Sequence, residues 1–366
     1  MEIEAVRLTE LEIGRELKYC GSRPSVRPRF MLLEVVGGGV VGEMMIWLGL
    51  EPEAAGPAIE SAGRAVLGLD PRKREQVLAA IQSSSLFLDP RVAASFDIAL
   101  WDLVGKLYET PVYTLLGGSR DRIPAYASGM WHPTVEEYVA EAEKAHAEGF
   151  PAYKLHPSGW IDFDTEVSAA VMDAVGDRMT LLFDGVGVYR DRNVSLRLGL
   201  HLQRLGYSLF EAPLPDRDHT GYRYLASKLD IPLAAGEWIN DPRDFAALVA
   251  TEAVQVVRTI GEWGLGITGM LKVGHLSEAH SLVFDPENFG STLVQAAHLH
   301  VQLGCMAAGH FEAPYGPSVD YLDDAMLDRV EFADGCALAP ERPGLGYRVD
   351  REAVERLARR RWGVGV

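Results

Sequence analysis

The sequence predicts an α/β protein in which a modified TIM (β/α) barrel follows an N-terminal α+β capping domain. Up to about residue 47 the pattern is that of strands, and from Glu51 to Leu107 it is that of helices. From Ile123 onward, strand and helix patterns alternate strictly, and eight strand candidates occur there, the number that closes a barrel. The length of 366 residues suits a barrel of about 250 residues plus a smaller domain.

We expect three segments in chain order. These are a capping domain at 1–122, the barrel at 123–343, and a C-terminal segment at 344–366 that returns to the cap. In the cap, the apolar stretch 30–50 is interrupted by two glutamates and by three glycines at 37–39, which predicts a hairpin turning at the glycines and no membrane-spanning helix. The helical part of the cap ends in a long apolar helix, Arg91 to Tyr108.

The barrel elements follow from short apolar runs separated by helical patterns. Thr134 and Glu137 form a capping box that begins one helix, and Gly149 ends the same helix. The eight strands are expected at 124–128, 151–156, 179–184, 208–211, 232–236, 254–259, 281–284 and 308–312.

Composition excludes several classes of function. The net charge of −17 argues against a nucleic-acid partner, and the basic runs 72–74 and 359–361 are interpreted as solvated helix ends. The acidic, alternating N-terminus predicts a strand and no signal peptide, and no membrane association is expected. Three widely spaced cysteines without zinc or disulfide spacing are typical of a reducing cytoplasm.

Acidic residues stand near the ends of three successive predicted strands. They are Asp184, Glu211 and Glu237, with spacings of 27 residues (184 to 211) and 26 residues (211 to 237). Each spacing fits one strand plus one helix, so the carboxylates should converge at the mouth of the barrel on one hard cation. One unit upstream, Lys154 and His156 lie two residues apart on a strand and should face that cation together.

These residues, with two longer segments, resemble the enolase superfamily over nearly the whole chain, and its mandelate racemase branch most closely. Residues 94–106 with 111–118 look like the junction between the cap and the barrel of that family, and residues 343–346 look like its C-terminal segment. The Lys154–His156 pair followed by the three carboxylates is similar to its base motif and metal ligands. Phe311-Glu312 looks like its eighth-strand end.

The resemblance implies a chemistry. The family removes the proton α to a carboxylate and forms an enediolate held by Mg²⁺, and a metal ion is one way to stabilise that developing charge. It implies Lys154, His156 and Glu312 as catalytic residues, with Glu312 protonated so that it can donate to the substrate carboxylate. Crowding by other carboxylates should raise the pKa of Glu312.

The sequence also departs from the family pattern. His156 replaces a lysine, and it is interpreted as the principal base or as a hydrogen-bond donor to a metal-bound carboxylate. Ile260 and Glu287 stand where the branch carries an aspartate–histidine pair, and Glu287 is interpreted as a helix cap or solvent ligand in preference to a replacement for that pair. Val186 stands where an asparagine is common, which removes a polar neighbour from the metal site.

Other polar residues receive structural interpretations. Asp97 and Asp102 in the apolar helix should satisfy backbone groups or salt bridges, and His298 and His300 should be structural. Trp131 and His132 follow the first strand in a loop, where they either touch substrate or pack.

We expect a lyase of the acid-sugar dehydratase kind that acts on a small carboxylate and assembles as a homo-oligomer. A racemase, epimerase or cycloisomerase is the second choice, and a non-catalytic relative that binds metal and carboxylate is the third. Specificity should come from cap loops at 18–28 and 43–50, in and beside which stand Tyr19, Arg23, Arg27, Arg29 and Trp47.

Overall fold

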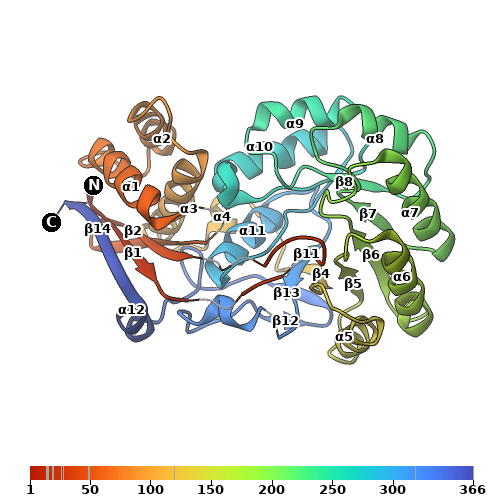
Figure 1. Ribbon diagram of the computed structural model, residues 1–366. Helices are drawn as coiled ribbons and strands as arrows, with labels where there is room; N and C mark the ends of the chain where they lie inside the picture. The colour runs from red at the N-terminus through yellow and green to blue at the C-terminus, as the bar shows by residue number, and fades with distance from the viewer. Residues whose placement is uncertain are drawn as a thin grey trace.

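The computed structural model describes residues 1–13, 16–18, 20–25, 27, 29–47, 50–118, 120–317 and 319–365. Figure 1 shows the cap with both chain ends on the left and the barrel on the right. The α/β fold with an antiparallel cap that the sequence predicts is confirmed, and the domain limits 122/123 and 343/344 stay predictions.

The cap is built on a four-stranded antiparallel sheet. Its order is β14 (Ala358–Gly365), β1 (Ile3–Leu11), β2 (Phe30–Gly37) and β3 (Val40–Ile46). Strands β2 and β3 form the expected hairpin, because Gly38 and Gly39 adopt the positive φ angles, 61° and 79°, that its tight turn requires. The last strand of the chain thus pairs with the first.

Helices α1 (Pro52–Val66), α2 (Arg74–Ser83), α3 (Pro90–Leu107) and α4 (Val112–Leu115) complete the cap. The apolar helix α3 is buried along most of its length and packs on β3. The two backbones approach so closely that a Cβ atom on Gly42 would lie 2.0 Å from the carbonyl oxygen of Ala99. Glycine at position 42 is therefore what lets the helix lie on the sheet.

All eight predicted barrel strands are present. They are β4 (Arg122–Ser128), β5 (Ala152–Leu155), β6 (Thr180–Asp184), β7 (Leu209–Glu211), β8 (Leu233–Ala235), β9 (Val256–Val257), β10 (Val283–Phe284) and β11 (Phe311–Pro314). Neighbours from β4 to β10 pair in parallel and in chain order, and β11 pairs with β4. A single parallel bridge between Phe284 and Ala308 continues the ring from β10 to the segment before β11.

The barrel helices cover the outside of this ring, as Figure 1 shows. They are α5 (Val135–Ala147), α6 (Ile161–Val175), α7 (Arg192–Leu205), α8 (His219–Ala226), α9 (Pro242–Val249), α10 (Gly266–Ala279) and α11 (Thr292–Gly304), and α12 (Arg351–Leu357) then leads into β14. Thr134 is the N-cap of α5 as expected, since the Glu137 N–H donates to Thr134 Oγ1 at 3.3 Å. Within the described ranges, no helix is long and apolar enough to span a membrane.

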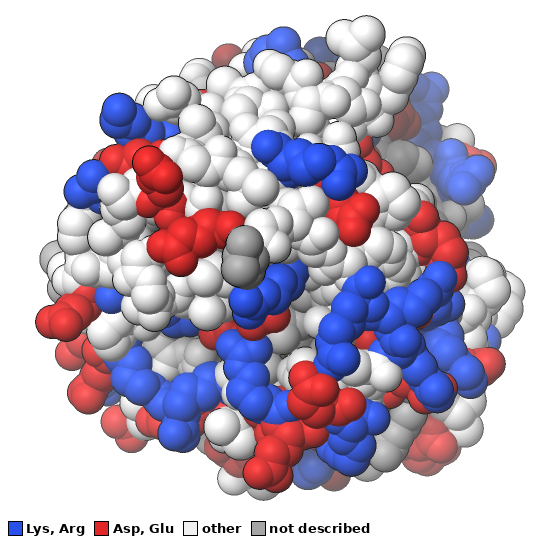
Figure 2. Space-filling view, turned by 90° about the vertical axis from the view of Figure 1, so that its left-hand side faces the viewer, with Lys and Arg blue, Asp and Glu red and all other residues white. Residues whose placement is uncertain are grey.

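Sequence reasoning missed two features and misplaced one. The hairpin of β12 (Phe332–Ala333) and β13 (Cys336–Leu338) extends the sheet beside β4, and a π-helical turn occupies Gly261–Leu265. The basic run 359–361 lies in strand β14 and not at a helix end, so that interpretation was wrong. Each of its arginines pairs with a glutamate, and Figure 2 shows basic and acidic side chains interspersed on this face.

Asp102 of α3 joins three parts of the chain. Its carboxylate accepts from the Glu43 N–H of β3 at 2.8 Å and from the Leu345 N–H of the C-terminal segment at 2.7 Å, and it pairs with Lys106 at 2.6 Å. Asp97 likewise accepts from the backbone N–H and the hydroxyl of Thr268. The interpretation of both aspartates as structural is confirmed.

We predict that Asp102→Ala lowers the free energy of unfolding by about 3–5 kcal/mol, because two buried N–H donors and an ammonium group lose their acceptor together. Urea unfolding measures the change. The matched control is Asp244→Ala, which breaks an exposed pair with Arg217 and should cost about 1 kcal/mol or less. Equal losses for the two variants would contradict the role given to Asp102.

Candidate active site and metal centre

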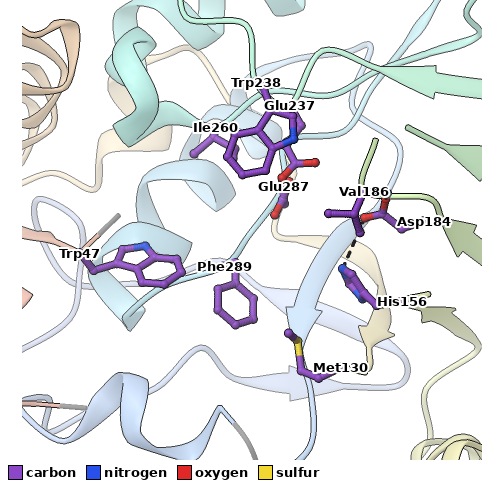
Figure 3. A pocket seen from close by; sticks show the side chains of 10 residues that line it. All are labelled: Trp47, Met130, His156, Asp184, Val186, Glu237, Trp238, Ile260, Glu287 and Phe289. Carbon is purple, nitrogen blue, oxygen red and sulfur yellow. Dashed lines mark hydrogen bonds and ion pairs between the residues drawn. The ribbon is translucent and has the colours of Figure 1, made fainter. Parts of the chain in front are cut away.

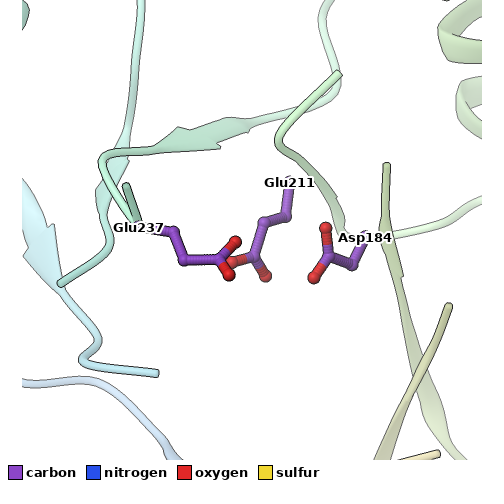
Figure 4. A group of neighbouring side chains, drawn as sticks. All are labelled: Asp184, Glu211 and Glu237. Atoms are coloured by element: carbon purple, nitrogen blue, oxygen red, sulfur yellow. The ribbon is translucent and has the colours of Figure 1, made fainter. Parts of the chain in front are cut away.

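Three carboxylates converge at the C-terminal ends of neighbouring strands. Asp184 and Glu211 end β6 and β7 and are paired in register, and Glu237 lies two residues beyond β8. Each offers an oxygen within 4.8 Å of the others, and all three residues are buried (Figure 4). The structure therefore brings together the three residues that the spacing singled out.

This cluster fits a hard divalent cation. Oxygen ligands from carboxylates are what Mg²⁺ prefers. Burial raises the pKa of Glu211 to about 7 and that of Glu237 well above its usual range, so a cation placed between these groups would stabilise their charged forms. Within the part of the chain that the structure describes, Oε2 of Glu237 has no hydrogen-bond partner.

Below the carboxylates lies a ring of four alternating charges. Lys154 Nζ is 2.9 Å from both Glu211 Oε2 and Glu312 Oε1, while Arg258 donates to Glu211 Oε1 at 2.6 Å and also to Glu312. The four residues come from β5, β7, the end of β9 and β11, which are alternate strands of the barrel. They form one layer of its interior, as four side chains from alternate strands do in such barrels.

Glu312 is surrounded by donors. Besides Lys154 and Arg258, it accepts from Tyr126 Oη at 3.0 Å and from Ser128 Oγ at 2.6 Å. Burial alone would raise the pKa of Glu312, but the two cations hold it well below its usual range. The expectation of a protonated Glu312 was therefore wrong, because the sequence did not reveal Arg258 as its partner.

The structure fixes the tautomer of His156. Its Nδ1 lies 2.6 Å from the carbonyl oxygen of Gly129, which can only accept, so Nδ1 carries the hydrogen and Nε2 has the lone pair. Nε2 lies 3.4 Å from Asp184 Oδ2. Burial and the charge of Lys154 lower the pKa of His156, so a neutral ring is favoured. A neutral imidazole with a free Nε2 can accept a proton.

A pocket opens over this site between the barrel and the cap (Figure 3). His156, Asp184, Glu237 and Glu287 line it together with six apolar side chains, Trp47, Met130, Val186, Trp238, Ile260 and Phe289. Lys154, Glu211 and Glu312 are fully buried and do not line this pocket. The ammonium group of Lys154, which the sequence predicts to be catalytic, is enclosed by carboxylates.

Glu287 does not have the place that the sequence suggested. Helix α11 begins at Thr292, so Glu287 caps no helix and that part of the interpretation was wrong. The residue is partly buried and lines the pocket, and its Oε2 is buried. Figure 3 shows its carboxyl beside that of Glu237. Burial, followed by the charge of Glu312, raises the pKa of Glu287 to about 8. Near neutral pH the pocket thus holds a protonated carboxyl group.

The cap loops contribute unequally to the pocket. Trp47 enters it from the end of β3, and Arg23 donates to the carbonyl oxygen of Val186 at 2.8 Å. Arg29 pairs with Glu10 instead, and Tyr19 lies outside the described residues.

The other histidines of interest have structural contacts. His298 and His300 accept backbone N–H groups of Gly261 and Tyr113, each at 2.9 Å, so their structural interpretation is confirmed. His132 lies 3.0 Å from Glu141 and does not line the pocket.

Arg258 is the residue that sequence reasoning missed. A signal was present, because Arg258 stands two residues before Ile260 and residues at i and i+2 of a strand share a face.

Comparison with known proteins agrees with this geometry. Residues 137–353 match the family described as Enolase C-terminal domain-like. The chain belongs to the enolase superfamily.

Relatives within the superfamily are enzymes of more than one kind. The chain is 28% identical over 261 residues to the arabinonate dehydratase of Saccharolobus solfataricus, covering 69% of this chain and 68% of that protein. It is 26% identical over 373 residues to the D-galactarolactone cycloisomerase of Agrobacterium fabrum, covering 97% and 98%. The prediction of an enzyme, with a lyase as first choice, is confirmed at the level of the family.

A solved structure shares the fold of the whole chain. It is the L-talarate/galactarate dehydratase of Salmonella typhimurium LT2, liganded with Mg and L-lyxarohydroxamate. The TM-score is 0.86 at 23% identity, and the match covers 100% of this chain and 94% of that one.

We predict that Mg²⁺ binding near neutral pH releases protons. Burial raises the pKa of Glu237 well above its usual range, so the protonated form of this carboxyl is favoured when no cation is bound, and a metal ligand must be deprotonated. Affinity should therefore rise as the pH rises through the neutral range. Calorimetry in buffers of different ionisation enthalpy measures the released protons, and a heat that is independent of the buffer would contradict this account.

Proposed function

We propose that the protein is a Mg²⁺-dependent lyase that dehydrates a hydroxylated carboxylate of the acid-sugar kind. One observation carries this proposal: the free Nε2 of His156 lies in the same pocket as the carboxylates of Asp184 and Glu237, with Glu211 beside them. The similarity to an arabinonate dehydratase supports it.

Asp184, Glu211 and Glu237 are the residues that would hold the metal. Bound Mg²⁺ would stabilise the negative charge that develops on the substrate carboxylate as the α-proton leaves. The Mg-liganded structure of the same fold supports the choice of ion.

The chain's own residues supply the proton chemistry. Nε2 of His156 takes the proton from C2, the C3–O bond breaks, and the hydroxide leaves as water with the proton that His156 has just accepted. The remaining enol tautomerises to a 2-oxo acid. The carbonyl of Gly129 keeps the ring in the required tautomer. Lys154 and Glu312 act from below as positioning residues and do not line the pocket. Lys154 pairs with Glu211, and Glu312 acts through Lys154 and Arg258, which both contact Glu211.

Glu287 supports a second candidate function. A racemase or epimerase needs competent groups on both faces of the α-carbon. In Figure 3 the Glu287 carboxyl stands apart from the His156 ring across the pocket. The similarity to a cycloisomerase keeps isomerisation open, and a non-catalytic carboxylate-binding protein is the remaining alternative. Homo-oligomeric assembly and a cytoplasmic location stay predictions.

The test of the proposed function is α-proton exchange and dehydration, followed by NMR in D₂O with Mg²⁺ and a panel of acid sugars. We expect a 2-oxo acid from at least one of them and exchange from only one α-epimer. Exchange of both epimers would favour the epimerase and make Glu287 the second base. Ligand binding with neither exchange nor product would favour the non-catalytic alternative.

We predict that His156→Asn slows α-exchange by about 10²–10⁴-fold, since a general base contributes that much. Mg²⁺ affinity should be retained, because His156 is not one of the three clustered carboxylates. Exchange at the parental rate in this variant would move the base role to another residue.

We predict that Glu237→Gln weakens Mg²⁺ binding by about 100-fold or more, because losing even an outer partner of a metal site costs about 10–100-fold. Calorimetry measures the affinity. The control is Glu141→Gln, which alters a buried carboxyl that accepts from Tyr153 Oη outside the cluster. Parental affinity in Glu237→Gln would mean that the site is misplaced.

A further inference from the structure

Most of the pocket wall that the structure describes is apolar. Of the ten described residues that line it, His156, Asp184 and Glu237 serve the proposed reaction, and Glu287 serves the second candidate function. The remaining six, Trp47, Met130, Val186, Trp238, Ile260 and Phe289, present hydrocarbon or aromatic surface. In Figure 3, Trp47 and Phe289 lie on the side away from Asp184 and His156.

The only polar side-chain atom of Trp47 is engaged within the protein. Its Nε1 donates to the buried Glu262 at 3.4 Å, and its ring lies 5.2 Å from that of Phe289 and 6.2 Å from that of Phe30. Because the ring is packed between these neighbours, it offers an apolar face to the pocket.

An apolar wall discriminates between a hydroxylated and an alkyl substrate chain. Each hydroxyl that leaves water without a new partner costs about 1–3 kcal/mol, whereas each buried methylene gains about 0.8 kcal/mol. Hydroxyls near the metal carboxylates find partners there. Hydroxyls further along a sugar chain would face Trp47 and Phe289.

The backbone conformation of Val186 also supports an apolar wall. Val186 has a φ angle of 48°, a left-handed conformation that costs a β-branched residue about 1–3 kcal/mol and that asparagine adopts far more readily. Its N–H donates to Asp184 Oδ1 at 2.7 Å, and its carbonyl accepts from Arg23 at 2.8 Å, so both sides hold it there. A strained valine in the pocket wall indicates that its apolar side chain serves the site.

We propose that the substrate is a 2,3-dihydroxy carboxylate whose carbon chain is apolar beyond C3. This inference rests on the proposed function, which requires the hydroxyls at C2 and C3. The metal carboxylates and His156 take the carboxylate end, and the wall of Trp47, Val186 and Phe289 takes the alkyl end. The substrate is thus a 2,3-dihydroxyalkanoate, which has the reacting end of an acid sugar and no hydroxyl groups beyond C3.

Calorimetry with Mg²⁺ compares six-carbon ligands that differ in their distal hydroxyls. The probes are 2,3-dihydroxyhexanoate and three hexonates, gluconate, galactonate and mannonate. We expect 2,3-dihydroxyhexanoate to bind at least about tenfold more tightly than each hexonate, with a negative heat-capacity change from apolar burial. Val186→Asn should reduce that ratio about tenfold while thermal stability is kept or increased, since the strain is relieved.

The matched control is Glu252→Asn. Glu252 also has a left-handed backbone, with φ 55°, but it is exposed and away from the pocket. This variant should gain or keep stability in the same way and leave the ligand ratio unchanged. If the ratio of the two affinities is unchanged in Val186→Asn, or changes equally in the control, the wall does not discriminate between alkyl and hydroxylated chains.

The outcomes separate this inference from the proposed function. Tighter binding of a hexonate, with dehydration of acid sugars in D₂O, would overturn the apolar substrate class and leave the lyase standing. Intact Mg²⁺ binding with no binding, exchange or product from any 2-hydroxy acid would overturn the proposed function and this inference with it.

Discussion

The site depends on the need to neutralise two cations that are buried inside the barrel. Lys154 and Arg258 are fully buried, and an unpaired charge at such a depth costs several kcal/mol. Glu211 and Glu312 each contact both cations, so the four charges close a ring in which every member has two opposite neighbours. This ring sets the positions of β5, β7, β9 and β11 relative to one another.

The ring stands on an apolar floor. Ala152, Leu209 and Val256, each two residues before a member of the ring, pack together with Tyr126, Leu182 and Ala234. Residues at i and i+2 of a strand share a face. On each of these strands an apolar residue is therefore followed, on the same face, by a charged one, and the boundary between the hydrophobic interior and the polar site lies between them. Glu211 belongs to both the ring and the carboxylate cluster, so the charges below the pocket hold one of the three carboxylates that would bind the cation.

The cap completes the pocket and is held by a second buried polar cluster. Asp102 fastens β3 and the C-terminal segment to α3, and β3 leads directly to Trp47. Arg23 reaches across from the cap to the backbone beside Asp184. The packing of the cap therefore decides which surface faces the substrate, whereas the barrel decides the chemistry.

The sequence by itself determined the order of the elements and the carboxylate cluster. Periodicity revealed all eight strands, and the spacing of Asp184, Glu211 and Glu237 was enough to bring them together, because parallel strands end at one edge. The tertiary structure alone decided the ionisation of Glu312, the tautomer of His156 and the place of Glu287. Those properties depend on partners more than 20 residues away, such as Arg258 for Glu312 and Gly129 for His156, and a one-dimensional pattern does not contain such contacts.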